Sequence, residues 1–202
     1  YSPDAASAGR RALRNEALGL IALASPQEGA RLCEAQFAAG DNLTDRLAAL
    51  AAMTLVPGEA REALIARFAK TYAAEPLVLD KWLMAQALIP EASTLDRVRE
   101  LMQHPAFSMG NPNRIRALIG GFAANLTQFN RTDGTGYAFV AEMVIALDRT
   151  NPQVASRLLS SFKSWRMLEP GRRTLAQGRL AQVAATPNLS RDVADIAERT
   201  LA

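Results

Sequence analysis

The sequence predicts an all-α protein, an α–α superhelix of the armadillo or HEAT type with about eleven helices. Alanine and leucine dominate the 202 residues, of which 49% are hydrophobic and 21% charged, and such residues lose little conformational freedom in a helix. Aromatic residues make up only 6%, which argues against a sandwich or barrel. Helix-start signals recur between apolar-periodic segments, and pairs of these segments repeat at the spacing of stacked helix pairs.

Six helices are expected in the first half of the chain. Ser25, Pro26 and Glu28 have the pattern of a helix start, in which Ser25 is the N-cap, Pro26 opens the first turn and Glu28 completes a capping box. Ser93 or Thr94 is expected to cap the sixth helix. Turn and breaker residues separate the others at Gly40–Asn42, Pro57–Gly58, Pro76 and Pro90. The first predicted helix ends near residue 24, and the other five span 26–39, 43–51, 63–72, 76–88 and 94–103.

Two helices in the second half begin with the same dipeptide, Asn111-Pro112 and Asn151-Pro152. Asparagine is a favoured N-cap and proline a favoured first helical residue. Residues 124–135 are expected to form a loop, in which Asp133–Gly136 makes a turn, because no strand precedes it and a phosphate-binding loop needs another glycine. The predicted helices span 112–122, 137–149 and 152–162, with one beginning at 170 and one capped by Ser190.

Short connectors favour antiparallel neighbours, and stacked pairs bury each apolar face against the next. All of 1–202 is therefore interpreted as one helical domain. A closed helical bundle is the alternative, although so many short helices are unusual for a single bundle.

The chain has one cysteine, Cys33, and one histidine, His104. An internal disulfide is therefore impossible, and a zinc site built by this chain alone is disfavoured because such sites use mainly Cys and His. Cys33 is interpreted as a small buried residue, and His104 as a helix C-terminal cap favoured by the helix dipole. Trp82 and Trp165 are interpreted as packing anchors. No apolar segment is long enough to cross a membrane, and a cytoplasmic protein is expected. Because it starts at Tyr1 rather than methionine, the chain is expected to be a piece of a longer protein.

Positive charge is concentrated in the second half. Residues 1–100 hold 11 Lys and Arg against 13 Asp and Glu, whereas residues 101–202 hold 12 against 7. Twenty of the 23 basic residues are arginine. Without a dense basic stripe or interleaved aromatic residues, nucleic acid is not the expected partner. A cleft for a ligand with a negative end fits the charge equally well. The arginine excess is interpreted either as a bias in genomic composition or as carboxylate recognition by a few of these arginines.

Arginines near two helix starts are the candidate site residues. Arg114 and Arg116 fall in the first turns of the helix that begins at Pro112, where the helix dipole disfavours cations unless an anion is nearby. Gln153 and Arg157 are four residues apart and share one helix face. Two such helix N-termini would form a carboxylate pocket if they met in space. The alternative is that these arginines pair with Asp or Glu elsewhere.

Several motifs, taken in order, carry a family resemblance. The chain resembles the C-terminal helical domain of bacterial aminopeptidase N, the zinc-dependent, thermolysin-like alanyl aminopeptidase family, over essentially all of 1–202. The motifs are Gly9–Asn15, Asn111–Gly120, Asp133–Tyr137 and Asn151–Leu158. The resemblance implies that a β-rich domain, a catalytic domain, a β-sandwich domain and some first helices lie upstream. The family's zinc ligands, exopeptidase motif and oxyanion-stabilising tyrosine belong to the catalytic domain and have no counterpart here.

The resemblance therefore implies a domain that caps the active site and limits peptide access, with zinc in the parent enzyme's catalytic domain and no cofactor in this chain. No catalysis is expected from the chain alone. Arg116 and Arg157, with Gln153 near them, are implied to line the cavity and position the carboxyl side of a peptide held by the catalytic domain of the same polypeptide. Arg114 is a weaker candidate and is equally interpreted as structural.

Two other function classes are alternatives to this one. A free-standing helical-repeat scaffold would bind a protein partner on its concave face. A self-sufficient enzyme is disfavoured, because metal ligands and a plausible general base are missing.

Overall fold

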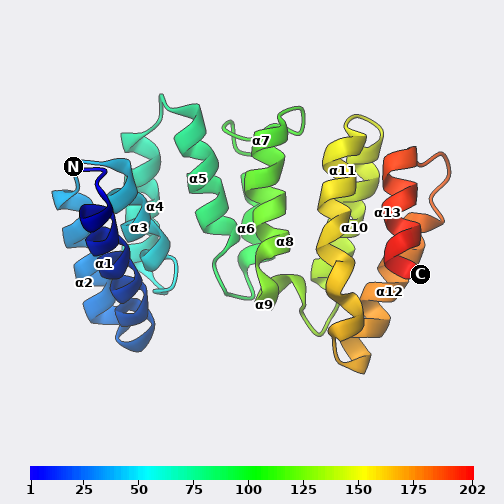
Figure 1. The fold of residues 1–202 in the computed structure, drawn as a ribbon, viewed down its shortest axis with the longest axis horizontal. Coiled ribbons are helices and arrows are strands. Elements are labelled where there is room, and N and C mark those ends of the chain that lie inside the picture. The colour runs from blue at the N-terminus through cyan, green and yellow to red at the C-terminus, as the bar shows by residue number, and fades with distance from the viewer. The chain divides into compact units, whose positions relative to one another are not determined.

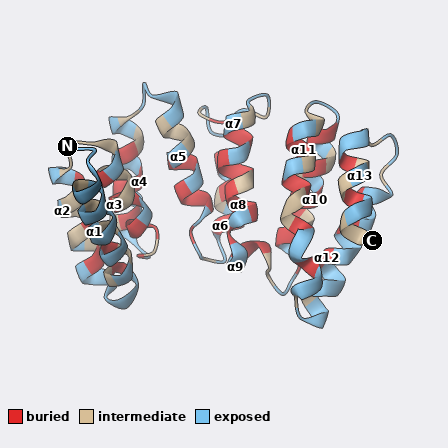
Figure 2. Cartoon of the chain, viewed as in Figure 1, coloured by how far each residue is buried: buried red, intermediate tan, exposed pale blue.

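A computed structural model describes residues 1–202, and every regular element in it is a helix (Figure 1). The predicted all-α class is confirmed. The chain divides into two compact units, Tyr1–Ala85 and Gln86–Ala202, which are described in turn. Figure 2 shows the buried residues on the helix faces that meet within each unit. None of the helices has the length and apolar character needed to span a bilayer.

Close helix contacts build the first unit. On α2 (Pro26–Ala39), a Cβ added at Gly29 would lie 2.4 Å from the Cα of Ala22 on α1 (Ala5–Ala24), so glycine permits this approach. The rings of Phe37 and Phe68 lie 6.1 Å apart. The indole nitrogen of Trp82 donates to the carbonyl of Ile65 at 3.0 Å, which confirms Trp82 as a packing anchor. The helices are α1 (Ala5–Ala24), α2 (Pro26–Ala39), α3 (Leu43–Met53), α4 (Glu59–Thr71) and α5 (Pro76–Ala87), whose last residues enter the second unit.

A buried carboxylate joins α1 to the start of α3. Asp45 forms an ion pair with Arg14. The Asn42 side chain accepts from the Asp45 backbone N–H and donates to its carboxylate, both at 2.9 Å. Burial alone would raise the pKa of Asp45, but the hydrogen bonds from Arg14 and Asn42 outweigh it and hold that pKa below its ordinary value.

The second unit contains two irregular helices. One is a π-helical turn, η1, and the other is a 3-10 helix, η2. Its elements are α6 (Thr94–Leu101), α7 (Pro112–Ile115), η1 (Arg116–Gly120), α8 (Gly121–Ala124), α9 (Leu126–Phe129), α10 (Thr135–Asp148), α11 (Pro152–Leu159), η2 (Ser160–Met167), α12 (Pro170–Ala184) and α13 (Arg191–Leu201).

An aromatic cluster forms the centre of this unit. The ring of Phe129 on α9 meets Tyr137 on α10 and Phe162 on η2 edge-on, at centroid separations of 5.1 and 5.2 Å. The Tyr137 hydroxyl donates to the side-chain oxygen of Asn130 at 2.9 Å, so its one polar group is satisfied. Three elements are thereby tied together around one buried core.

A second polar link joins α10 to α13. The buried carboxylate of Asp148 accepts from the backbone N–H of Ser190 at 2.8 Å and from its hydroxyl. The Ser190 hydroxyl oxygen also accepts from the N–H of Val193 at 3.2 Å. The predicted cap at Ser190 is confirmed.

Two predicted caps are wrong in detail. Ser25 stands at the start of α2, with Pro26 in its first turn, but its side chain makes no cap hydrogen bond. The carboxylate of Glu28 accepts instead from Arg31, at 2.8 and 2.6 Å, so no capping box forms. Neither Ser93 nor Thr94 caps α6 through its side chain, because Ser93 makes no such bond and the Thr94 hydroxyl donates to the carbonyl of Ile89 at 2.7 Å.

The predicted loop 124–135 contains a helix, α9. Asn125 caps it by accepting from the N–H of Gln128, while its amide donates to the carbonyls of Ala87 and Ile89 at 3.1 and 2.8 Å. These tertiary partners are not visible in a local pattern. The rest of the segment does turn, with Gly134 in the left-handed region at φ 72° and the Asp133 carboxylate accepting from Thr135 N–H at 3.0 Å.

The remaining single residues have structural environments. Cys33 is fully buried, and desolvation raises the pKa of its thiol to about 11. The indole nitrogen of Trp165 donates to the carbonyl of Thr200 at 2.9 Å, which confirms the second packing anchor. His104 follows α6, and its Nδ1 accepts from the N–H of Ala106 at 3.0 Å, so the ring supports the turn beyond the helix.

Replacing Gly136 by alanine should destabilise the protein. An added Cβ would lie 2.4 Å from the carbonyl oxygen of Phe129 and 2.5 Å from that of Gln128, and such overpacking costs about 1–3 kcal/mol. Urea denaturation measures this loss. Gly178→Ala is the matched control, because its Cβ would meet open space on α12 and alanine favours a helix by about 0.5–1 kcal/mol. Equal stability of the two variants would contradict the close contact.

Asp45→Asn should lower the free energy of unfolding by about 1–3 kcal/mol at pH 7, because a charged partner of Arg14 is lost. The folded-state pKa of Asp45 is depressed, so its stabilisation exists above the unfolded pKa near ~4 and disappears as pH falls through the folded value. The gap between wild type and variant should therefore narrow below pH 4. Urea titrations at pH 7 and pH 3 measure it. Asp96→Asn is the control, because Asp96 is exposed in its ion pair with Arg99. Its free energy of unfolding should fall by about 1 kcal/mol or less.

Candidate functional site

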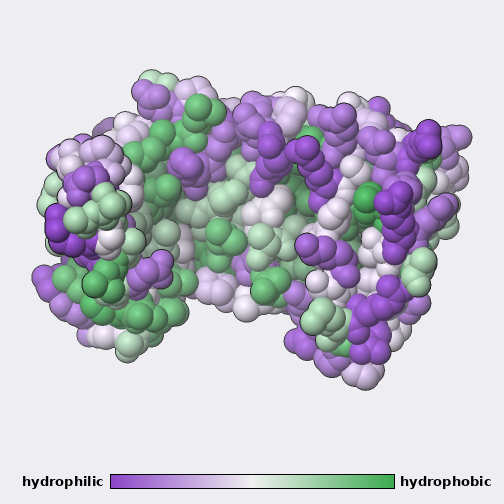
Figure 3. Space-filling view, viewed as in Figure 1, coloured by the Kyte–Doolittle hydropathy of each residue, from purple (hydrophilic) through white to green (hydrophobic).

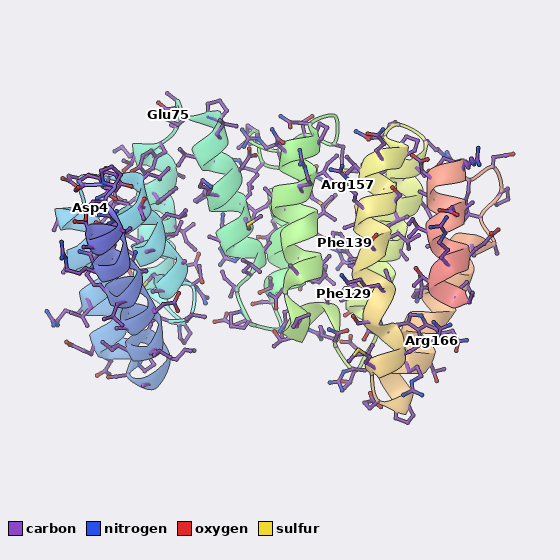
Figure 4. The ribbon with its side chains drawn as sticks, in the orientation of Figure 1. Asp4, Glu75, Phe129, Phe139, Arg157 and Arg166 are labelled. Carbon is purple, nitrogen blue, oxygen red and sulfur yellow. The ribbon has the colours of Figure 1, made fainter.

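A pocket in the second unit lies between the helical segment α7–η1–α8 and the segment α11–η2. Its volume is about 360 Å³, within the range of small-ligand sites. Two predicted site residues, Arg116 and Arg157, line it together with Lys163, and we call it the arginine pocket. In Figure 4, Arg157 projects from α11 on the side toward α8. The apolar wall consists of Ile115, Ala123, Ala124, Val154 and Leu158.

The two Asn-Pro helix starts set where the arginines fall. The side-chain oxygen of Asn111 accepts from the N–H groups of Asn113 and Arg114, at 2.9 and 3.4 Å. Asn151 accepts from the N–H of Val154 at 3.2 Å. Both predicted N-caps are confirmed. Because each cap fixes the first turn, Arg116 and Arg157 follow at defined positions on neighbouring helices.

Both walls of the arginine pocket contain irregular helix. Arg116 and Gly120 are the first and last residues of the π-helical turn η1, and both line the pocket. Such π-helical turns are rare in proteins, and those that occur are frequently found at functional sites. On the other wall, η2 carries Ser160, Ser161 and Lys163 into the lining. The predicted helix 152–162 therefore ends as an α-helix at residue 159.

The cations of the arginine pocket are not neutralised by acidic partners. Arg116 donates to the Asn113 side chain at 2.6 Å and to the carbonyl of Pro112 at 3.2 Å. Arg157 and Lys163 form no ion pair or hydrogen bond within the chain, and no acidic residue lines the pocket. The alternative that Arg116 and Arg157 pair with Asp or Glu elsewhere in the chain is not seen. Three uncompensated cations beside an apolar wall favour an anion that carries an apolar group. Figure 3 shows hydrophilic side chains over the α7 and α11 ends of this face and more hydrophobic ones nearer α9.

One polar group in the lining lacks a partner. The hydroxyl of Ser160 donates to the carbonyl of Ser156 at 3.1 Å. The Ser161 hydroxyl is buried and has no hydrogen-bond partner. Burying a hydroxyl without a hydrogen-bond partner destabilises the folded protein. Ser161 therefore stands out among the lining residues as a donor without an acceptor.

The other two predicted residues lie apart from the lining. Arg114 is buried, with 8% of its surface exposed, and has partners within the chain. Gln153 is exposed on α11 and does not line the pocket. The structure thus brings Arg116 and Arg157 together and leaves Gln153 and Arg114 outside. The roles of all four residues toward a substrate stay predictions.

Sequence reasoning missed Ser161 and Lys163. A continuous helix from 152 would rotate these residues differently from the observed 3-10 segment, so the helical pattern gave no reason to select them. Lys163 did carry a signal, because it is the one lysine in the arginine-rich second half.

The chain offers no group of three or more His, Cys, Asp or Glu that could hold a metal ion. Its one cysteine is buried with a raised pKa, which disfavours the thiolate that zinc requires. The residues present therefore do not fit a catalytic zinc site.

Comparison with known proteins gives a consistent family. The family model described as "Domain of unknown function (DUF3458_C) ARM repeats" matches residues 1–202. Aminopeptidase N of Caulobacter vibrioides is 39% identical over 202 residues, 100% of this chain and 23% of that protein. Aminopeptidase N of Escherichia coli is 39% identical over 194 residues, 96% of this chain and 22% of that protein.

A solved structure shares the fold. The crystal structure of Legionella pneumophila aminopeptidase A in complex with aspartic acid superposes with a TM-score of 0.89 at 27% identity, covering 98% of this chain and 23% of that one. The chain thus spans less than a quarter of the length of the proteins it matches. The relatives match through their C-terminal region, which confirms the resemblance carried by the motifs, and the ARM-repeat family agrees with the predicted armadillo-type fold.

Ser161→Ala should leave stability unchanged or raise it by up to about 1 kcal/mol, because the deleted hydroxyl is buried without a partner. Ser160→Ala, which loses the bond to the Ser156 carbonyl, should cost about 0.5–1.5 kcal/mol. Thermal and urea denaturation compare the two. A larger loss for Ser161→Ala than for Ser160→Ala would show that the Ser161 hydroxyl has an internal partner.

Proposed function

This chain belongs to the DUF3458_C ARM-repeat family. On that premise we propose that it is the C-terminal domain of a zinc-dependent aminopeptidase. In that enzyme the domain caps the active site, limits peptide access and helps to position the carboxyl side of the substrate. Its relatives are aminopeptidases that match through their C-terminal region. The proposal gives the protein a cytoplasmic location and a peptide partner, with no nucleic acid and no membrane.

The arginine pocket carries this proposal. Arg157 is a guanidinium with no partner in the chain, and Arg116 on the facing helix is held only by an amide and a backbone carbonyl. A guanidinium binds a carboxylate through two parallel hydrogen bonds, which orients the ligand as well as attracting it. A peptide held by its N-terminus elsewhere presents its carboxylate at the other end, so this charge suits the substrate's carboxyl side.

Chemistry at the scissile bond is assigned to residues outside this chain. The family resemblance implies zinc in the catalytic domain of the parent enzyme, and the residues of this chain do not fit a metal site. The chain's own contribution is binding. Contacts remote from the reacting bond that are equal in ground and transition states lower KM and leave kcat unchanged.

Charge reversal tests the proposal in the complete protein. Arg157→Glu and Arg116→Glu should each raise KM for an alanyl tetrapeptide by about tenfold or more, since an attraction becomes a repulsion, while kcat changes little. An alanyl anilide, which has no carboxylate, should show almost no change. Steady-state kinetics on both substrates measure this.

Arg149→Glu is the matched control, because Arg149 is exposed and lies outside the arginine pocket. It changes the net charge equally and should leave both substrates unaffected. Unchanged tetrapeptide kinetics for Arg116→Glu and Arg157→Glu would overturn the positioning role and favour the helical-repeat scaffold that binds a protein partner.

A further inference from the structure

We infer that Ser161 and Lys163 complete the arginine pocket as a selective site for a free C-terminal carboxylate on an apolar residue. The inference rests on the proposed function and adds two binding residues and a substrate class to it. Both residues lie on η2 and line the pocket. The ligand it describes is a short peptide that ends in an apolar residue.

Lys163 supplies a third positive charge. It is exposed and has no ion pair or hydrogen bond in the chain. Its flexible stem carries a compact charge with three donors, whereas the arginines on the opposite wall and on α11 present planar forks. A carboxylate bound by Arg157 still has acceptor capacity left, and Lys163, which lines the same pocket from η2, would supply a further donor.

Ser161 supplies a hydroxyl that has no hydrogen-bond acceptor within the chain. Nearby serines on α11 and η2 satisfy theirs internally, because Ser156 donates to the carbonyl of Gln153 at 3.1 Å and Ser160 to that of Ser156 at the same distance. Ser161 alone of these three is unpaired. Ser161 lines the arginine pocket, where a ligand carboxylate would give its hydroxyl the missing acceptor.

The wall composition defines the rest of the ligand. Five apolar residues line the pocket beside the cations, and among them Ile115, Val154 and Leu158 are largely buried whereas Ala124 is exposed. An inorganic anion would leave this surface in contact with water, whereas an apolar side chain next to the carboxylate removes it from water favourably. The combination of cations and apolar wall therefore selects a carboxylate attached to an apolar residue.

The carboxylate part is tested with Ser161→Ala and Lys163→Ala in the complete protein, using Ala-Ala-Leu and its C-terminal amide. Each variant should raise KM for the acid by about 3- to 10-fold, as expected for loss of one hydrogen bond or charge. The amide should change less than twofold, and kcat should be unchanged for both. Lys163→Arg should restore most of the affinity, because it keeps the charge.

Matched controls separate a local effect from a global one. Lys81→Ala removes an exposed lysine from the first unit, and Ser164→Ala removes an exposed serine next to Lys163 that does not line the arginine pocket. Both should leave acid and amide kinetics unchanged. Equal effects of Ser161→Ala or Lys163→Ala on acid and amide, or no effect on either, would overturn the inference.

The apolar part is tested by filling the pocket. Ala124 is exposed and lines it, so Ala124→Leu should reduce the preference for Ala-Ala-Leu over Ala-Ala-Gly about fivefold or more, through KM for the leucine peptide. An unchanged preference would overturn the apolar assignment. The proposed function fails if Arg116→Glu and Arg157→Glu leave KM for the tetrapeptide unchanged. If these two variants raise KM while the Ser161, Lys163 and Ala124 variants leave the kinetics unchanged, only the present inference fails.

Discussion

Burial of three side chains at a spacing of three residues shapes the second unit. Leu159, Phe162 and Trp165 are all buried, with exposures of 0%, 1% and 6%. A 3-10 helix has three residues per turn and aligns such side chains on one face, whereas an α-helix would rotate each away from the last. The segment after α11 therefore tightens into η2 so that Phe162 reaches the aromatic cluster with Phe129 and Tyr137. Ser161 and Lys163 lie between these anchors and line the arginine pocket.

Charge on the two walls complements that packing. Arg116 begins η1 directly after α7, and Arg157 lies in the last turn of α11, so the helix starts at Asn111 and Asn151 fix their positions but do not place them at the positive ends of the helix dipoles. No carboxylate from the chain offsets them in the pocket. A protein that keeps unpaired cations beside an apolar wall forgoes stabilisation that an ion pair would give, and a bound anion restores it. Structure and charge thus point to the same kind of ligand.

Much of the fold follows from local patterns. Pro26, Pro112, Pro152 and Pro170 all open helices as predicted, because proline has no N–H to lose in a first turn. The failures occur where a side chain takes a partner other than the expected cap, either nearby in the sequence or far from it. Glu28 is drawn to Arg31 instead of a cap, and Asn125 starts an extra helix because its amide is held by the carbonyls of Ala87 and Ile89.

The sequence by itself determined the all-α class, most helix starts and the two arginine-bearing segments, since each depends on neighbours within a few turns. Tertiary structure decided that Arg116 and Arg157 share a pocket, that Arg114 is buried, that Gln153 lies outside, and that Ser161 is left unpaired. It did so because the π turn η1 and the 3-10 helix η2 depart from the 3.6-residue period, and packing between helices, rather than local propensity, stabilises those departures.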